Sequence, residues 1–375
     1  MQATTDHATP RFLFVPVTGG EGLGEFARCL TLAHGVLERW PAARVRFVRD
    51  RESPEIDDDR IEALEITGSP TYNSARINSW MELEPPDVAI FDSTGRRSQL
   101  DAAGRLGAKR VLIASRPSRR RKVLLRRMLS RSDQVWLIEP DVRRRHLDRW
   151  ERLNLWLSGA RSHVVFVEAL FPVSVESRRE AVVRDVGLDG CPFALFSPGG
   201  GGWLVQNRPA AEVFIEAARL VSEGSELATI VITGPLHEGK LTAAPSVIVK
   251  RSLSPERLAD LIHEAEILVI GGGSSVGQAI AMGKLIVATA LGGSDQAERV
   301  ARYAEQGLLV SCAPEPDLLA GSVLALHGDE ARRHAMRDRQ AALPLRNGLD
   351  TALDSLAGLL RGSSRAPDVD VDSAP

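Results

Sequence analysis

The sequence predicts an α/β protein made of two doubly wound, parallel-sheet domains of the Rossmann type. Two observations carry this prediction: short β-rich segments alternate with helical segments along nearly the whole chain, and most of those strands are apolar throughout. Strands that are apolar on both faces belong to parallel sheets that helices cover on both sides. At 375 residues the chain is long enough for two such domains, each with its own core.

The expected strands fall into two groups. In the first half we expect them at 11–17, 44–50, 61–66, 87–93, 110–115, 134–139 and 163–169, and in the second half at 193–199, 229–234, 246–251, 267–273, 285–290 and 307–312. Helical periodicity fills most of the intervening segments. The predicted organisation is an N-terminal domain (1–172), a polar linker (173–192), a C-terminal domain (193–328), a last helical segment (329–362) and a disordered tail (363–375).

Bulk composition narrows the functional class. The chain is 43% apolar and 26% charged with a net charge of −2, so its overall charge gives no reason to expect nucleic acid as a partner. No apolar run approaches the ~20 residues that span a bilayer, and the N-terminus lacks the basic start and apolar core of a signal peptide. The cysteines and histidines show no ligand spacing. We therefore expect a cytoplasmic protein with no metal and no cofactor.

Three glycine-rich turns follow predicted strands. The first, VTGGEGLGEFARCLTLA (17–33), leads into a helix that should begin near Gly24 or Glu25. The second, SPGGGGWLVQNRPAAEVFIEAARL (197–220), places four glycines before a helix for which Asn207 is a plausible N-cap. A glycine loop that feeds a helix N-terminus suits a phosphate, although such a loop is about as often only a tight turn.

The third turn is the most informative. In ILVIGGGSSVGQAIAMGKLIVATALGGSDQ (267–296), a strand ends in three glycines and a short helix runs to Gly283, which suits a left-handed C-terminal cap. The next strand leads into a helix whose first turn carries Asp295 and Gln296. A carboxylate beside an amide offers the acceptors and donors that adjacent sugar hydroxyls need. The alternative is that Ser294 caps this helix and Asp295 complements its dipole.

A basic run stands out between Arg116 and Arg131, where eight basic residues occur without an acidic one. Its helix should begin near Ser118, so Arg119 and its neighbours crowd the end at which positive charge is unfavourable. An anionic ligand would relieve that repulsion. We expect an acidic, phosphorylated or lipid-linked acceptor here, or peripheral contact with the inner face of an anionic membrane. The alternative is a solvated basic face.

The order of these parts resembles the GT-B glycosyltransferases, in particular the branch with the lipid-II-forming N-acetylglucosaminyltransferase and the UDP-sugar hydrolase of pseudaminic acid synthesis. Three patches carry the resemblance: GLGEFARCLTLA, LSPERLADLIHEAEILVIGGGSS and QAIAMGKLIVATALGGSDQ. The resemblance implies the GT-B fold, in which two Rossmann-like domains face each other across a cleft. It also implies a metal-independent, inverting transfer of a sugar from a nucleotide donor, UDP by family bias.

The resemblance also implies roles for individual residues. On the donor side it assigns Gly200, Gly201, Gly202, Leu253, Gly273, Ser274, Ser275, Gln278, Asp295 and Gln296, and on the acceptor side Gly20, Gly22, Gly24, Arg116 and Arg119. Gln278 replaces the family's glutamate at the ribose, and Lys284 replaces its leucine. Glu25 occupies the position of the family's histidine, so it is the candidate base that takes the acceptor's proton, with Asp92 in reserve. Glu25 could equally bind substrate, or only stabilise the first turn of its helix.

Other reactions remain open at this point. A nucleotide-sugar hydrolase or a non-catalytic nucleotide-sugar-binding subunit would use the same donor pocket. GLGEFA also fits the dinucleotide fingerprint of an NAD-dependent oxidoreductase, with Asp50 at the second strand as the ribose ligand. GSSVG (273–277) fits the serine hydrolase pattern, with Ser275, Asp295 and His327 in hydrolase order.

Overall fold

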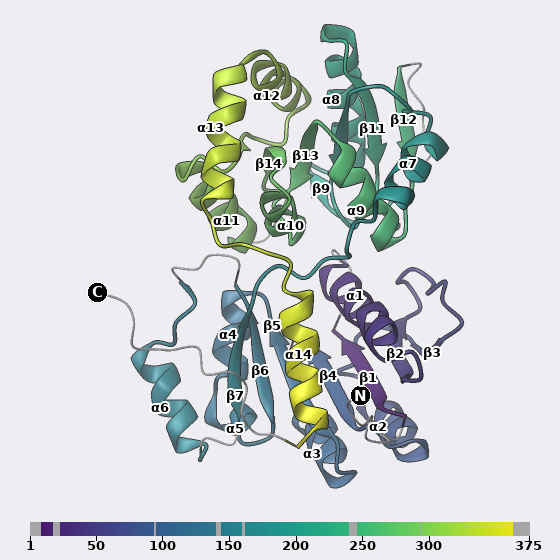
Figure 1. Cartoon of the computed structure of the whole chain (residues 1–375), viewed down its shortest axis with the longest axis vertical. Helices are drawn as coiled ribbons and strands as arrows, with labels where there is room; N and C mark the ends of the chain where they lie inside the picture. Colours follow the sequence, from purple (N-terminus) through teal and green to yellow (C-terminus); the bar gives the residue numbers. More distant parts are fainter. Residues whose placement is uncertain are drawn as a thin grey trace, which may run out of the picture. The chain divides into compact units, whose positions relative to one another are not determined.

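The chain divides into two compact units, each built on a parallel sheet (Figure 1). The computed structural model describes residues 9–17, 23–93, 95–139, 144–159, 162–239, 246–292 and 294–362. The first unit comprises residues 1–18, 28–170 and 348–375, and the second comprises residues 19–27 and 171–347. The predicted class, two doubly wound Rossmann-like units, is confirmed.

The first unit has a seven-stranded sheet with the order β3-β2-β1-β4-β5-β6-β7. All its pairings are parallel. Its strands are β1 (Arg11–Pro16), β2 (Arg44–Asp50), β3 (Ile61–Ile66), β4 (Val88–Asp92), β5 (Lys109–Ala114), β6 (Gln134–Ile138) and β7 (His163–Val167). Phe12, Phe14 and Phe91 are fully buried because helices cover both faces of the central strands. The helices described with this sheet are α1 (Gly24–Arg39), α2 (Ser74–Leu83), α3 (Arg97–Arg105), α4 (Pro117–Val123), α5 (Arg126–Leu129), α6 (Arg149–Leu157) and α14 (Leu349–Leu360).

The second unit repeats this plan with a six-stranded parallel sheet in the order β12-β11-β8-β13-β14-β15. The strands are β8 (Phe193–Ser197), β11 (Ala228–Ile232), β12 (Val247–Lys250), β13 (Ile267–Gly271), β14 (Leu285–Thr289) and β15 (Val310–Ser311). Two apolar clusters, one on each face, form its core. The helices are α7 (Glu176–Asp185), α8 (Ala210–Gly224), α9 (Pro255–Glu264), α10 (Ser275–Ala281), α11 (Ser294–Glu305), α12 (Pro316–Gly328) and α13 (Glu330–Ala341).

The structure corrects the sequence-based prediction at the second glycine turn. A two-residue hairpin, β9 (Leu204–Val205) with β10 (Arg208–Pro209), stands between the glycines and α8. Asn207 is therefore not the N-cap of α8: it has a φ of 64° in the hairpin turn, and Pro209 occupies the cap position. Asn tolerates the left-handed conformation that a two-residue hairpin turn requires. The glycine loop consequently does not feed a helix N-terminus directly.

The last helical segment is divided between the two units. Residues 329–362 form two helices, α13 and α14, and α14 belongs to the first unit (Figure 1). The Ser355 hydroxyl of α14 donates to Gln134 Oε1 of β6 at 2.6 Å. A Cβ at Gly35 of α1 would lie 3.0 Å from Leu349, so this glycine lets α14 pack closely on α1.

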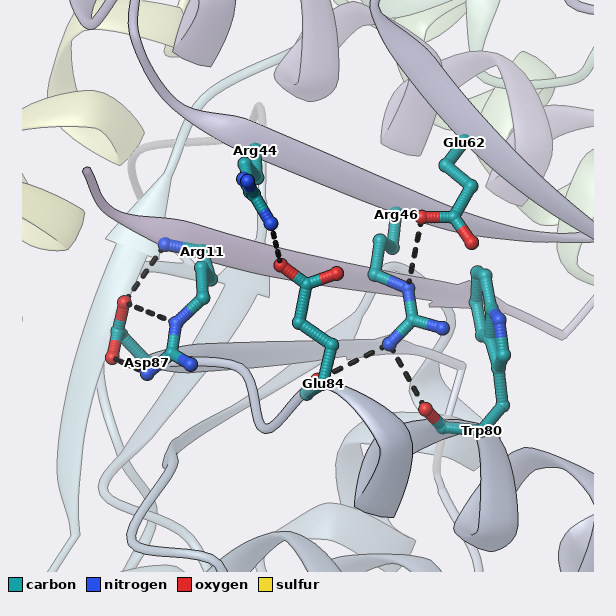
Figure 2. Close-up of polar contacts among 7 residues, drawn as sticks. All are labelled: Arg11, Arg44, Arg46, Glu62, Trp80, Glu84 and Asp87. Atoms are coloured by element: carbon teal, nitrogen blue, oxygen red, sulfur yellow. Dashed lines mark hydrogen bonds and ion pairs between the residues drawn. The ribbon is translucent and has the colours of Figure 1, made fainter.

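A charged cluster closes the amino-terminal edge of the first sheet (Figure 2). Arg11 forms a bidentate pair with Asp87, and Arg44 pairs with Glu84 at 2.8 Å. Arg46 is buried, with its guanidinium carbon 3.6 Å from the centre of the Trp80 ring. Burial lowers the pKa of Arg46, and Glu62 opposes that shift. The hollow beside this cluster, about 670 Å³, is lined by charges that already pair with one another, so we assign it a structural role.

Candidate functional site

The donor-side residues predicted from the sequence lie at the carboxyl-terminal edge of the second sheet. β8 and β13 are neighbours there, with Ser197 opposite Ile270, although β11 lies between them in the sequence. The chain thus leaves these two adjacent strands in opposite directions, which makes this edge the switch point at which open α/β sheets bind ligands. The second and third glycine-rich turns, after β8 and after β13, both begin at this point.

The turns at this edge pack backbone against backbone. Gly234, which follows β11, has a φ of 94°, and a Cβ there would lie 2.4 Å from Gly199 O. A Cβ at Gly201 would lie 2.8 Å from both Thr233 O and His237 N. Only glycine allows this approach, so the glycines of the SPGGGG segment serve to bring the β8 and β11 turns together.

The third turn joins the same cluster through Trp203. A Cβ at Gly292 would lie 2.2 Å from the Trp203 ring, and a Cβ at Gly272 would lie 3.2 Å from Gln296 Cβ. The turns after β8, β13 and β14 therefore form one continuous rim. Gly273 differs, because a Cβ there would meet nothing within 4 Å, so its surface faces open space.

The rim offers backbone donors to an anion. Among the described residues, no hydrogen bond is made by the N–H groups of Gly200, Gly202, Ser274 and Ser275. Ser274 is exposed, and Gly200, Gly202 and Ser275 are half-buried. Successive unpaired N–H groups in glycine turns are a recurrent means of holding phosphate oxygens.

Asp295 and Gln296 lie in the first turn of α11, and both are already engaged. Asp295 Oδ2 accepts from Arg299 Nη2 at 3.1 Å, and Arg299 Nη1 also donates to Gly272 O at 2.5 Å. Gln296 is buried, and its carbonyl accepts from the N–H of Leu291 at 3.1 Å. Arg299, one turn beyond the predicted pair, therefore fixes the carboxylate against the third turn. The side chain of Ser294, the alternative helix cap, lies outside the described residues.

The remaining donor-side predictions divide in two. Gln278 is half-buried on α10, the helix that follows Ser275, so it lies beside the third turn. Leu253 packs on the apolar core of the second unit, where it supports the sheet. Gly283 follows the end of α10 with a φ of 66°, so the predicted left-handed cap is confirmed.

His237 was not predicted as a site residue. It follows β11 in the sequence TGPLHEG, and its side chain is 2% exposed. Its Nε2 is buried without a hydrogen-bond partner among the described residues. Burial lowers the pKa of His237, and the nearby Arg251 charge lowers it further, so the imidazole is neutral at neutral pH. The only sequence signal was a histidine between the glycines of a post-strand turn.

The candidate base lies at the start of α1. Glu25 is 4% exposed in the first helical turn, and α1 begins at Gly24 as predicted. Residues 19–27 group with the second unit, and in that unit a Cβ at Gly24 would lie 3.3 Å from Ser274 Oγ. Gly20 and Gly22, the other predicted acceptor-side glycines, lie outside the described residues.

Asp92, the reserve base, ends β4 and is completely buried. Its two oxygens accept from Arg28 Nε at 2.7 Å and Arg28 Nη2 at 2.9 Å. Arg28 also donates to Ser115 Oγ at 3.2 Å, so the pair ties α1 to the ends of β4 and β5. A carboxylate held in a bidentate ion pair is stabilised as an anion and is a weak proton acceptor.

The basic run divides into structural and exposed residues. Arg120 makes a bidentate pair with the buried Glu151, both bonds 2.8 Å, which raises the pKa of Arg120, and Arg131 pairs with Asp101 at 3.0 Å. Arg116 is exposed and Arg119 is half-buried, at the start of α4. The helix begins at Pro117, one residue before the predicted start.

Lys284, another departure from the family pattern, gives a testable pH dependence. Its Nζ donates to His263 O at 2.6 Å, and burial lowers its pKa to about 8. Below that pH the Lys284 ammonium is charged in both the native and the unfolded protein, and its burial lowers the free energy of unfolding. Between about pH 8 and the unfolded value of 10.5 the native state alone sheds the proton, so this contribution to stability rises with pH.

Lys284→Met should remove that rise. The free energy of unfolding is measured with urea for both proteins at about pH 7.5 and at about pH 10. Between these pH values we expect that of the wild type to rise by about 1–2 kcal/mol relative to that of the variant. This is less than the whole pKa shift would give, because the side chain is only half-buried. Lys250→Met, at the exposed end of β12, is the control. Parallel curves for the wild type and Lys284→Met would contradict the buried-ammonium interpretation.

Two rival readings lose support from the geometry. His327 Nδ1 lies 3.0 Å from Glu266 Oε1 on another part of the second unit, so it is committed to that carboxylate rather than to Ser275. Asp50 Oδ1 accepts from Gly68 N at 3.1 Å and serves a turn of the first unit.

Among the described residues, no cluster of three or more His, Cys, Asp or Glu side chains is arranged to hold a metal ion. No helix of the described chain is long and apolar enough to cross a membrane.

Solved structures resemble the whole chain. No protein-family profile matches the sequence, and no curated protein matches it. The calicheamicin glycosyltransferase CalG4 superposes with a TM-score of 0.57 at 15% identity, over 96% of this chain and 100% of that one. A UDP-glucosyltransferase from Polygonum tinctorium that glucosylates indoxyl gives a TM-score of 0.61 at 12% identity, over 95% and 100%. A Listeria monocytogenes protein assigned as a UDP-N-acetylglucosamine 2-epimerase gives 0.58 at 14% identity, over 96% and 99%. The chain therefore has the GT-B fold expected from the sequence.

Proposed function

We propose that this protein is a glycosyltransferase that takes a sugar from a nucleotide-diphosphate donor, UDP-linked, and passes it to an anionic acceptor. The observation that carries the proposal is the glycine-rich rim at the switch point of the second sheet (the donor rim), where the N–H groups of Gly200, Gly202, Ser274 and Ser275 have no partner in the described part of the chain. A diphosphate needs several such donors. The likeness to a UDP-glucosyltransferase supports the choice of donor.

In this proposal the donor-side residues each bind a particular part of the nucleotide sugar. Asp295, whose Oδ2 is held by Arg299, accepts hydrogen bonds from sugar hydroxyls with its Oδ1, while Gln296 shapes the turn through Leu291 and presents its amide. Gln278 reaches the ribose with an amide in place of the family's carboxylate. Backbone donors aimed at the diphosphate stabilise the charge that develops on it as the glycosidic bond breaks, without a metal in the mechanism.

Glu25 is the proposed base. The acceptor oxygen must lose its proton as it attacks the anomeric carbon, so a proton acceptor has to lie beside the bound sugar. Gly24, the neighbour of Glu25, lies against Ser274 of the donor rim, which supports this assignment. Asp92 then acts as a positioning residue that holds Arg28, three residues after Glu25 on α1.

The acceptor side of the proposal rests on charge. A hollow of about 410 Å³ in the first unit is lined by Arg96, Arg97, Lys122 and Arg127, and it lies where β4 is followed by α3. Arg116 and Arg119 begin α4 after β5, the strand next to β4. A phosphorylated or lipid-linked acceptor fits this concentration of cations, and so does peripheral contact of the basic run with an anionic membrane from the cytoplasmic side.

Donor binding tests the proposal before any acceptor is known. We expect UDP and UDP-sugars, but not NAD, to bind in titration calorimetry and to raise the thermal midpoint. Asp295→Ala should weaken a UDP-sugar about tenfold and leave UDP itself unchanged, because only the sugar contact is lost. Asp317→Ala, an exposed acid in the first turn of α12, is the matched control. Binding of NAD in place of UDP would reject the proposal.

Hydrolysis of the nucleotide sugar is the second candidate. It would use the same donor rim, with water as the acceptor, and one similar structure belongs to a protein assigned to UDP-N-acetylglucosamine epimerisation rather than to transfer. Incubation with UDP-N-acetylglucosamine and no acceptor separates the two reactions. Rapid multiple-turnover release of UDP identifies a hydrolase, whereas a stable complex identifies a transferase or a binding subunit.

A further inference from the structure

Helix α6 presents an apolar face to the surface of the first unit. Trp150 and Trp156 are 74% and 72% exposed, and Leu153 and Leu157 are each 41% exposed. At about 100° per residue, positions 150, 153 and 157 share one face and position 156 adjoins it. Single exposed apolar residues need no explanation, but two tryptophans and two leucines on one nine-residue helix form a contiguous patch of the kind that marks an interaction site.

The rest of α6 is firmly anchored, so the exposure is not a frayed end. Asp148 Oδ1 accepts from Glu151 N at 2.8 Å, and Glu151 Oε2 accepts from Asp148 N at 2.9 Å. This capping box fixes the start of the helix. Glu151 is also the buried partner of Arg120. The helix therefore turns Glu151 and Leu155 inward and its tryptophans outward.

Cations border the apolar face. α5 packs against α6 (Figure 1), and a hollow of about 420 Å³ joins them, lined by Leu125, Arg126, Arg127, Ser130 and Asn154. Arg126 and Arg127 are exposed, as are Arg149 and Arg152 on α6 itself. The acids close to them are occupied: Glu151 holds Arg120, Asp101 holds Arg131, and Asp148 caps the helix. Among the described residues, none of these four arginines forms an ion pair, so their positive charge stands beside the patch.

We propose that this surface, α6 with the adjoining α5, binds an anionic lipid bilayer, with α6 lying in the plane of the interface. Tryptophan combines a large apolar ring with an N–H donor and is stable at the headgroup level, and leucine reaches the acyl boundary. The four arginines contact lipid phosphates while their stems cover apolar surface. The inference deepens the membrane contact proposed above by supplying its apolar anchor, and it does not depend on sugar transfer.

Vesicle binding tests this surface directly. The full chain, without any sugar donor, is sedimented with vesicles of phosphatidylcholine alone or mixed with phosphatidylglycerol. We expect binding to the mixed vesicles only, weakened by salt, with a blue shift of tryptophan fluorescence. Trp150→Ser with Trp156→Ser should lower the partition coefficient at least about tenfold. Arg126→Gln with Arg127→Gln should lower it about tenfold and reduce the salt dependence.

Control measurements distinguish vesicle binding through α6 from binding through any exposed apolar side chain and from self-association. Leu83→Ser removes an apolar side chain that is 82% exposed elsewhere on the first unit and should bind vesicles as the wild type does. Unchanged vesicle binding by the double tryptophan variant would overturn the proposal. The proposal would also be overturned if the protein did not bind vesicles but self-associated through the tryptophans in sedimentation velocity. The apolar face of α6 would then be a contact between copies of the chain. Because no sugar donor is present, failure of the glycosyltransferase proposal would leave these results unaffected.

Discussion

Glu25→Gln should reduce the rate of sugar transfer by about 100-fold or more while leaving the affinity for a UDP-sugar within about twofold. The amide keeps the size of the side chain but cannot accept a proton, and loss of a general base costs about 10²–10⁴ in rate. The assay measures UDP release in the presence of pooled sugar-phosphate and lipid-phosphate acceptors. Donor affinity is measured in parallel by calorimetry, so that a loss of rate is not confused with a loss of binding.

The matched control for this variant is Glu38→Gln, which changes an exposed glutamate near the other end of α1. It should have the activity of the wild type. An equal loss of rate and of donor affinity in Glu25→Gln would assign Glu25 to binding rather than to proton transfer. Activity equal to that of the wild type would reduce Glu25 to a residue that stabilises its helix.

The second large effect is expected at Gly234. An alanine Cβ there would lie 2.4 Å from Gly199 O and 2.5 Å from Gly201 N, and neither backbone can move without opening the donor rim. We expect Gly234→Ala to lower the free energy of unfolding by about 3 kcal/mol or more, from left-handed strain together with the clash, and to abolish measurable UDP binding. Urea unfolding and calorimetry report the two effects separately.

Gly187 provides the matched control for Gly234. It has a φ of 80° in the same unit, but a Cβ there would meet nothing within 4 Å. Gly187→Ala therefore measures the backbone strain alone, about 1–2 kcal/mol, and should leave UDP binding intact. If the two variants lost the same stability and both bound UDP, the close packing of the turns after β8 and β11 would have no functional importance.

Sequence patterns predicted the sheets better than the connections between them. Buried parallel strands are apolar on both faces, so their signal is strong, and all thirteen expected strand segments are present, most of them trimmed at the ends. The segment 307–312 keeps only Val310–Ser311 as strand. The hairpin β9–β10 was missed because two-residue strands carry no periodicity, and Asn207 is suited to a turn as well as to a cap.

The candidate site was predictable in outline and not in its contacts. Glycines after strands and the Asp295–Gln296 pair mark the carboxyl edge of a sheet, where ligands bind. The contacts within the site depend on tertiary packing, much of it between turns that are far apart in the sequence. Examples are the pairing of Arg299 with Asp295, the contact of Trp203 with Gly292 and the burial of His237 beside Gly201. The same limit applies to α14, whose amphipathic sequence does not specify which sheet it covers.

Hydrogen–deuterium exchange of the full chain, with and without UDP, tests the central claim most directly, because it reports where the nucleotide binds. The predicted result is slower exchange in the turns after β8, β13 and β14, at residues 199–203, 272–278 and 290–296, with little change along the amino-terminal edge of either sheet. Protection confined to the turns of the first unit, or no protection at a UDP concentration that saturates binding, would contradict a donor site on the second sheet.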